Sequence, residues 1–121
     1  MSNNTEIKQK NYPEIIARVS NNLSQLRQDI PDVMKGFGQL ASSASQEGEL
    51  SAKTKEMIAM ALSVAVRCDP CIGFHAKALV KLGANKKELE EVLGMAVYMG
   101  GGPSLMYAAD ALAAFEQFGG Q

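Results

Sequence analysis

The residues best suited to chemistry lie within eight consecutive positions, Cys68-Asp69-Pro70-Cys71-Ile72-Gly73-Phe74-His75. This segment contains both cysteines and the only histidine of the chain. Two cysteines at positions i and i+3 can form a disulfide at the start of a helix. Because the loop closed by such a bond is very short, the bond would restrict the unfolded chain little. We therefore interpret the two cysteines as residues that take part in a reaction rather than as a disulfide that stabilises the fold.

Cys71 is expected in the first turn of a helix, where unpaired N–H groups and the helix dipole favour a thiolate. His75 follows one helical turn later on the same face and could take up the thiol proton. Cys68 would resolve the product that Cys71 forms. With a peroxide that product is a sulfenic acid, whereas with another disulfide the same pair performs thiol–disulfide exchange.

Glu56 is a further candidate, on the same helical stripe as Arg67. A straight helix would place Glu56 about 18 Å from Cys68 along its axis, at 1.5 Å per residue. Contact with the cysteines therefore requires that the next helix folds back as a hairpin, or that another subunit supplies a side chain. A surface carboxylate near Lys53 and Lys55 is the alternative interpretation. Arg67 could stabilise a Cys68 thiolate or only shield the helix end.

Two other interpretations of the cysteines stay open. A Cys-x-x-Cys pair can be half of a structural zinc site, but such a site needs four ligands and His75 would supply only a third. Free cysteines are also often buried in protein cores without any chemical role. We expect redox chemistry that uses no metal and no bound organic cofactor.

Apolar residues recur at three- and four-residue steps along most of the chain and predict six helices. Their starts are marked by proline, serine, aspartate or asparagine and their ends by glycine; the expected residues are Pro13, Pro31, Ser51, Asp69, Asn85 and Pro103 at the starts, and Gly48, Gly83 and Gly100 among the ends. No alternating strand pattern is present, so the predicted fold class is all-α. We expect residues 1–10 to be a disordered tail and residues 11–121 to be a single helical domain.

Composition excludes several classes of function. The net charge is −1 and the basic residues form no stripe, which argues against a nucleic-acid partner. No apolar run reaches the roughly 18 residues that a membrane span needs. The polar N-terminus lacks the apolar segment of a secretory signal, so we expect a cytoplasmic protein with reduced thiols. Residues 57–66 are apolar on nearly every helical face, which indicates burial by subunit contacts.

The sequence resembles the carboxymuconolactone decarboxylase superfamily, specifically its alkylhydroperoxidase D-like branch, over roughly residues 31–118. The resemblance is carried by the spacing of Glu56, Cys68, Cys71 and His75, and by framing segments that include Gly48-Glu49-Leu50-Ser51, Lys81-Leu82-Gly83-Ala84 and Met99-Gly100-Gly101-Gly102-Pro103. It implies an all-helical homo-oligomer, a trimer or a hexamer, with thiol-dependent peroxidase activity. Cys71 would then attack the peroxide and Cys68 would resolve the product. His75 and Glu56 would form the proton relay.

One position departs from that pattern. Pro70 occupies the place where the peroxidases often have a second histidine, and its presence could slow peroxide chemistry or shift the protein towards disulfide exchange. The expected function is reduction of hydroperoxides, with a thioredoxin-like or lipoyl protein as the external dithiol reductant. The alternatives are a thiol–disulfide oxidoreductase without strong peroxidase activity, a non-enzymatic redox-responsive oligomeric module and, less favoured, a lactone decarboxylase.

Overall fold

The computed structural model describes residues 7–121, and within that range it contains six α-helices and no strand. The helices are α1 (Tyr12–Asp29), α2 (Pro31–Ser45), α3 (Ala52–Ala65), α4 (Asp69–Lys81), α5 (Lys86–Gly100) and α6 (Gly102–Gln117). The predicted all-α fold class and number of helices are therefore confirmed. Among the described helices, none combines the length and apolar character that crossing a membrane requires.

Local capping explains where α3 and α5 begin. The Ser51 hydroxyl accepts a hydrogen bond from the backbone N–H of Thr54 at 3.1 Å. Asn85 and Glu88 form a capping box, in which each side chain accepts a hydrogen bond from the other residue's backbone N–H. These side chains satisfy N–H groups that have no partner inside the helix, as the sequence predicts.

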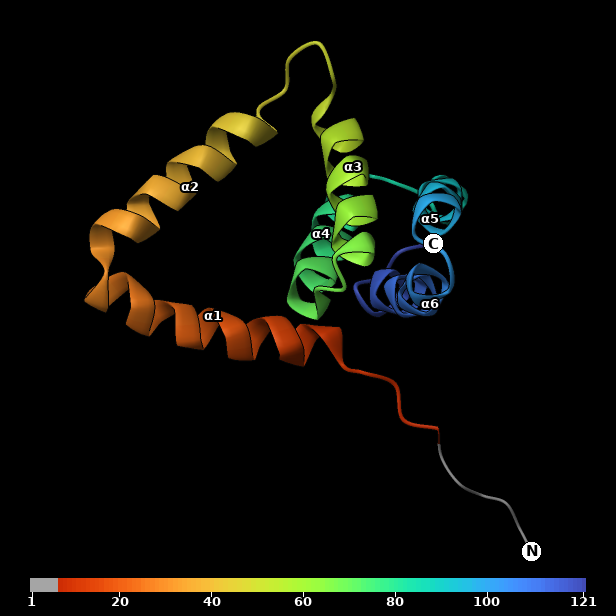
Figure 1. The fold of residues 1–121 in the computed structure, drawn as a ribbon, viewed down its shortest axis with the longest axis horizontal. Helices are drawn as coiled ribbons and strands as arrows, with labels where there is room; N and C mark the ends of the chain where they lie inside the picture. The colour runs from red at the N-terminus through yellow and green to blue at the C-terminus, as the bar shows by residue number, and fades with distance from the viewer. Residues whose placement is uncertain (1–6) are drawn as a thin grey trace, which may run out of the picture.

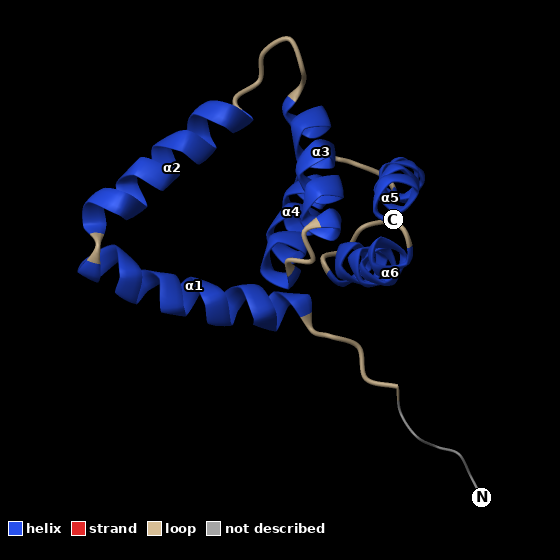
Figure 2. Cartoon of the chain, viewed as in Figure 1, coloured by secondary structure: helices blue, strands red, loops and turns tan. Residues whose placement is uncertain are grey.

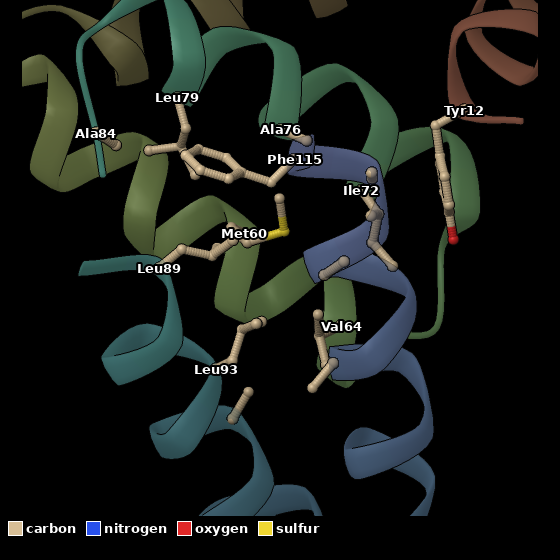
Figure 3. Close-up of a cluster of buried hydrophobic side chains, with 14 residues drawn as sticks. Tyr12, Met60, Val64, Ile72, Ala76, Leu79, Ala84, Leu89, Leu93 and Phe115 are labelled. Carbon is tan, nitrogen blue, oxygen red and sulfur yellow. The ribbon is translucent and has the colours of Figure 1, made fainter. Parts of the chain in front are cut away.

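Helices α3, α4, α5 and α6 pack around one apolar core. Met60 of α3 and Phe115 of α6 are fully buried in this core, with Leu79 of α4 and Leu93 of α5 around them (Figure 3). The chain turns back sharply between α3 and α4, and these two helices pack against each other along much of their length. This hairpin determines which residues of α3 lie beside the cysteine segment.

Helix α1 joins the core only through its first half. Tyr12 and Ile16 are buried, and a Cβ added to Gly73 of α4 would lie 2.5 Å from Cγ2 of Ile16. The absence of a side chain at Gly73 is therefore what lets α1 cross so close to α4. The second half of α1 runs outward, and both Leu26 and the C-cap residue Ile30 are exposed.

Helix α2 stands apart from the helices of the core. It contacts only α1 and α3 among the described helices, and none of its residues is buried. Figures 1 and 2 show it as one side of an open triangle with α1 and α3. The apolar periodicity of α2 is thus real, but its own chain does not cover it.

Helices α2 and α3 each carry an exposed apolar stripe. The α2 stripe consists of Val33, Phe37 and Leu40. The α3 stripe consists of Ile58, Leu62 and Val66. The sequence predicts that residues 57–66 are buried by subunit contacts. Within the single chain Met60, Ser63 and Val64 are buried, whereas the α3 stripe is exposed.

Candidate active site

The two cysteines form a disulfide at the start of α4. Cys68 is the N-cap residue of this helix and Cys71 lies in its first turn, with 5.2 Å between their Cα atoms. The backbone N–H of Cys71 donates a hydrogen bond to Sγ of Cys68 at 3.2 Å. Asp69 lies at the start of this helix, as expected, but its side chain is not the N-cap: the sulfur of Cys68 accepts the capping hydrogen bond instead.

His75 and Glu56 meet across the α3–α4 hairpin. The distance from Nδ1 of His75 to Oε2 of Glu56 is 2.5 Å, and the two side chains are 33% and 19% exposed. The hairpin brings Glu56 to the histidine of its own chain, so no second subunit is needed for this contact. Within residues 7–121, Nε2 of His75 has no hydrogen-bond partner, which leaves that nitrogen free for proton transfer.

The surroundings of the two sulfurs differ. The amide hydrogen bond reaches Cys68, and such a bond stabilises negative charge on the sulfur that accepts it. Cys71 instead lies four residues before His75, hence on the same helical face. Both cysteines are partly exposed, so neither is sealed in the core. Each sulfur has one local feature that favours a thiolate.

Asp69, between the two cysteines in the sequence, belongs to a hydrogen-bonded network that the sequence does not predict. The Tyr12 hydroxyl donates a hydrogen bond to Oδ1 of Asp69 at 2.8 Å. The Nζ atom of Lys10 lies 2.9 Å from Oδ2 of Asp69 and also 2.9 Å from Oδ2 of Asp110. Gln117 of α6 accepts a hydrogen bond from the Tyr12 backbone N–H and donates one to the Lys10 carbonyl.

These contacts have clear electrostatic consequences. Hydrogen bonds to Asp110 and Asp69 raise the pKa of Lys10 to about 12. Burial, followed by the hydrogen bond to Asp69, raises the pKa of Tyr12 above its ordinary value. No sequence signal reveals the network, because Lys10 and Tyr12 precede Asp69 by 59 and 57 positions. Lys10 belongs to residues 1–10, for which the sequence predicts a disordered tail; residues 1–6 of that range lie outside the described residues.

Arg67 has an unusual backbone conformation directly before Cys68. Its φ is 60°, and no other non-glycine residue among residues 7–121 has a positive φ. The N–H of Arg67 donates to the carbonyl of Val64, and the N–H of Cys68 donates to that of Ser63, which together form a Schellman motif at the end of α3. The Arg67 side chain is exposed. Glycine usually occupies this position because it has no Cβ.

The four predicted site residues thus form two pairs on consecutive helices. Cys68 and Cys71 are bonded to each other, and Glu56 is bonded to His75. In the part of the chain that the structure describes, no group of three or more His, Cys, Asp or Glu side chains is arranged to hold a metal ion. What the arrangement offers is a dithiol/disulfide couple beside a hydrogen-bonded imidazole.

Sequence comparison connects this arrangement with known proteins. The profile of the carboxymuconolactone decarboxylase family matches residues 31–114, a range that includes all four predicted site residues. An uncharacterized protein from Cupriavidus necator is 39% identical over 101 residues, which are 84% of this chain and 89% of that protein.

Solved structures share the same fold. A carboxymuconolactone decarboxylase family protein from Legionella pneumophila, solved in its apo form, is 56% identical and superposes with a TM-score of 0.87 over 88% of this chain and 96% of that chain. A family member from Thermotoga maritima is 28% identical, with a TM-score of 0.76 over 84% of this chain and 87% of that chain. For the Thermotoga protein, involvement in the antioxidative response has been suggested.

Proposed function

Because this chain belongs to the carboxymuconolactone decarboxylase family, we propose that it is a thiol-dependent peroxidase that reduces hydroperoxides through Cys68 and Cys71. The observation that supports this best is the cysteine pair at the start of α4, with His75 one turn beyond Cys71 and bonded to Glu56. The antioxidative role suggested for the Thermotoga maritima relative agrees with this proposal.

The proposed cycle begins with the dithiol form. His75 accepts the thiol proton of Cys71, and the thiolate attacks one oxygen of the hydroperoxide. The O–O bond breaks, Cys71 becomes a sulfenic acid, and the other oxygen leaves with the proton held by His75 as an alcohol. Cys68 then attacks the sulfenic sulfur, which forms the disulfide and releases water. Each cycle consumes one hydroperoxide and two thiol hydrogens.

Glu56 acts on His75 in this cycle. Its carboxylate fixes the ring through Nδ1 and leaves Nε2 as the nitrogen that exchanges protons. The negative charge of Glu56 also stabilises the imidazolium that forms when Cys71 is deprotonated. An external dithiol, such as a thioredoxin-like or lipoyl protein, would return the disulfide to the dithiol by exchange.

A thiol–disulfide oxidoreductase is the second candidate function. Pro70 lies inside the Cys-x-x-Cys motif and has neither a titratable side chain nor a backbone N–H, so His75 is the only imidazole near the sulfurs. Disulfide exchange needs an accessible thiolate but no proton donor for an alkoxide leaving group. The two functions therefore differ in whether the reduced protein consumes peroxide.

Stopped-flow measurement of tert-butyl hydroperoxide consumption by the reduced protein tests the proposal. We expect one equivalent to be consumed per chain, no consumption by C71S, and a single turnover by C68S that leaves a sulfenic acid detectable with dimedone. If peroxide consumption does not depend on Cys71, the peroxidase proposal is excluded and thiol–disulfide exchange becomes the favoured function. Consumption that requires Cys68 but not Cys71 would reverse the roles of the two cysteines.

We further propose that the active protein is a homo-oligomer, a trimer or a hexamer, in which copies of the chain cover the α2 and α3 stripes. The support is that α2 has no buried residue, although its apolar side chains recur at helical spacing. A soluble monomer rarely exposes contiguous apolar surface of this kind.

Sedimentation equilibrium tests the oligomer. F37E places a charge in the α2 stripe and should dissociate the assembly, whereas Q39E introduces the same side chain elsewhere on α2 and should not. Both positions are exposed in the single chain, so neither change should unfold it. A wild-type protein that sediments as a monomer would refute this proposal.

A further inference from the structure

We propose that Lys10 and Tyr12 are positioning residues that set the reduction potential of the Cys68–Cys71 disulfide, by holding and neutralising the carboxylate of Asp69. This inference rests on the proposed redox function of the two cysteines. We refer to Lys10 and Tyr12, with the side chains that they bind, as the N-terminal clamp.

The clamp is built from the backbone and the side chains of one segment, in which Lys10 precedes α1 and Tyr12 is the first residue of α1. Gln117 binds the carbonyl of Lys10 at 2.7 Å and the N–H of Tyr12 at 2.8 Å, which fixes the segment to α6. The Tyr12 ring is fully buried against α4 near Gly73, and its hydroxyl reaches Asp69. The segment is therefore fixed at several points to the helix that carries the cysteines.

The clamp holds the carboxylate of Asp69, which lies between the two cysteines in the sequence, where its charge can affect their thiols. Asp69 follows Cys68 directly, precedes Cys71 by two residues and opens α4. An uncompensated carboxylate at this place disfavours a thiolate on either neighbour, because like charges repel. Lys10 supplies the opposite charge at 2.9 Å, and the Tyr12 hydroxyl binds the other carboxylate oxygen at 2.8 Å.

The remaining charges around the clamp do not replace Lys10. Asp110 of α6 also binds Nζ of Lys10, so loss of the lysine would leave two carboxylates without their cation. The Nζ atom of Lys10 lies 5.2 Å from the centre of the Tyr107 ring, and this cation–π contact also helps to hold the ammonium group in place. Lys10 is therefore the cation that balances the acidic groups at this end of α4.

The effect on the redox couple follows from the charges of its two states. Reduction by an external dithiol breaks the Cys68–Cys71 bond, transfers two electrons to the sulfurs and releases thiol or thiolate groups. The disulfide itself carries no charge. A bare Asp69 carboxylate would destabilise the thiolate form but not the disulfide, so removal of Lys10 should favour the oxidised state.

The test is to equilibrate the protein with dithiothreitol mixtures at pH 7 and to measure the fraction of disulfide. For K10M we expect the thiol–disulfide equilibrium constant to shift about two- to fivefold towards the disulfide. Because a tenfold change in this constant corresponds to 29.6 mV, the reduction potential should become about 10 to 20 mV more negative. K86M is the matched control, since Lys86 is also 43% exposed and also pairs with a carboxylate, that of Glu116. K86M should not shift the potential, and K10R should restore it.

A second comparison separates charge balance from simple structural support. A D69N background lacks the carboxylate that lies between the two cysteines in the sequence, so adding K10M there should shift the potential by less than half as much as in the wild type. The free energy of unfolding is measured for each variant. An unchanged potential in K10M, or an equal shift with and without Asp69, would overturn the proposal. Neither assay uses peroxide, so failure of the peroxidase proposal would be recognised separately.

Discussion

The Nδ1 atom of His75 lies 2.5 Å from Oε2 of Glu56, although the two residues are 19 positions apart on consecutive helices. The contact exists because the chain reverses between α3 and α4 and the two helices pack against each other. It gives the only imidazole of the chain a fixed ring orientation, one helical turn beyond Cys71.

Replacing Glu56 by glutamine should slow peroxide reduction. The amide of E56Q can still bind His75, but it carries no charge to stabilise the imidazolium. We expect kcat/KM for the hydroperoxide to fall about tenfold or more, with little change in stability, because proton transfer through a positioned base contributes on the order of 100-fold or more. E116Q, a change to an exposed carboxylate of α6, is the control. Equal activity of E56Q and E116Q would exclude a role for Glu56.

Replacing Gly73 by alanine should destabilise the fold. The added Cβ would lie 2.5 Å from Cγ2 of Ile16, so α1 would have to move away from α4. We expect the free energy of unfolding to fall by about 1 to 3 kcal/mol, the usual cost of overpacking. In G94A nothing lies within 4 Å of the new Cβ, and the higher helix propensity of alanine should stabilise α5 by about 0.5 to 1 kcal/mol. Urea unfolding measures both, and effects of the same sign would contradict this packing argument.

Replacing Arg67 by glycine should stabilise the protein. Arg67 has a φ of 60° in a Schellman motif, whereas Gly83 has a φ of 81° in the same motif at the end of α4. A left-handed conformation costs a residue with a Cβ roughly 1 kcal/mol or more. We therefore expect R67G to raise the free energy of unfolding by about 1 kcal/mol and G83A to lower it by a similar amount.

The same position also tests the two roles that the sequence suggests for Arg67. R67N removes the positive charge but keeps a residue that tolerates the left-handed conformation. If the guanidinium stabilises a Cys68 thiolate, R67N should raise the thiol pKa measured by absorbance at 240 nm. If the side chain only shields the helix end, the thiol pKa should not move.

The stability contributed by Glu88 should depend on pH. A hydrogen bond from Lys53, and a second from the backbone N–H of Asn85, lower the pKa of Glu88 below the 4.5 of an unfolded chain. A lowered folded-state pKa contributes stability above the unfolded value, and this contribution is lost as pH falls through the folded value. E88Q should therefore be less stable than wild type at pH 7, and the difference should shrink below pH 4.5. A difference that stays constant down to pH 3 would contradict the assignment.

Features that depend on neighbouring residues could be predicted from the sequence. Helix periodicity, the capping box of Asn85 and Glu88, and the placement of Cys71 and His75 on one helical face all involve positions three or four residues apart. The backbone hydrogen bonds of a helix form between such positions, so residue types alone determine them. The all-α fold class could be predicted for the same reason.

The cap of α4 shows the limit of this local reasoning. Asp69 has the residue type of a good N-cap, yet its carboxylate binds Lys10 and Tyr12, and the sulfur of Cys68 accepts the N–H of Cys71 instead. Competition from a segment more than 50 positions away decided the outcome. Propensity describes what a residue can do locally, but the contacts available in the folded chain determine what it does.

The sequence by itself determined the six helices and the spacing of the cysteines and the histidine. Tertiary structure alone decided that Glu56 binds the histidine of its own chain, that Lys10 and Tyr12 hold Asp69, and that α2 leaves its apolar side chains exposed. These contacts depend on how helices cross, and a crossing is set by the shapes of all the packed side chains together, as the close approach of α1 at Gly73 illustrates. No window of a few residues contains that information.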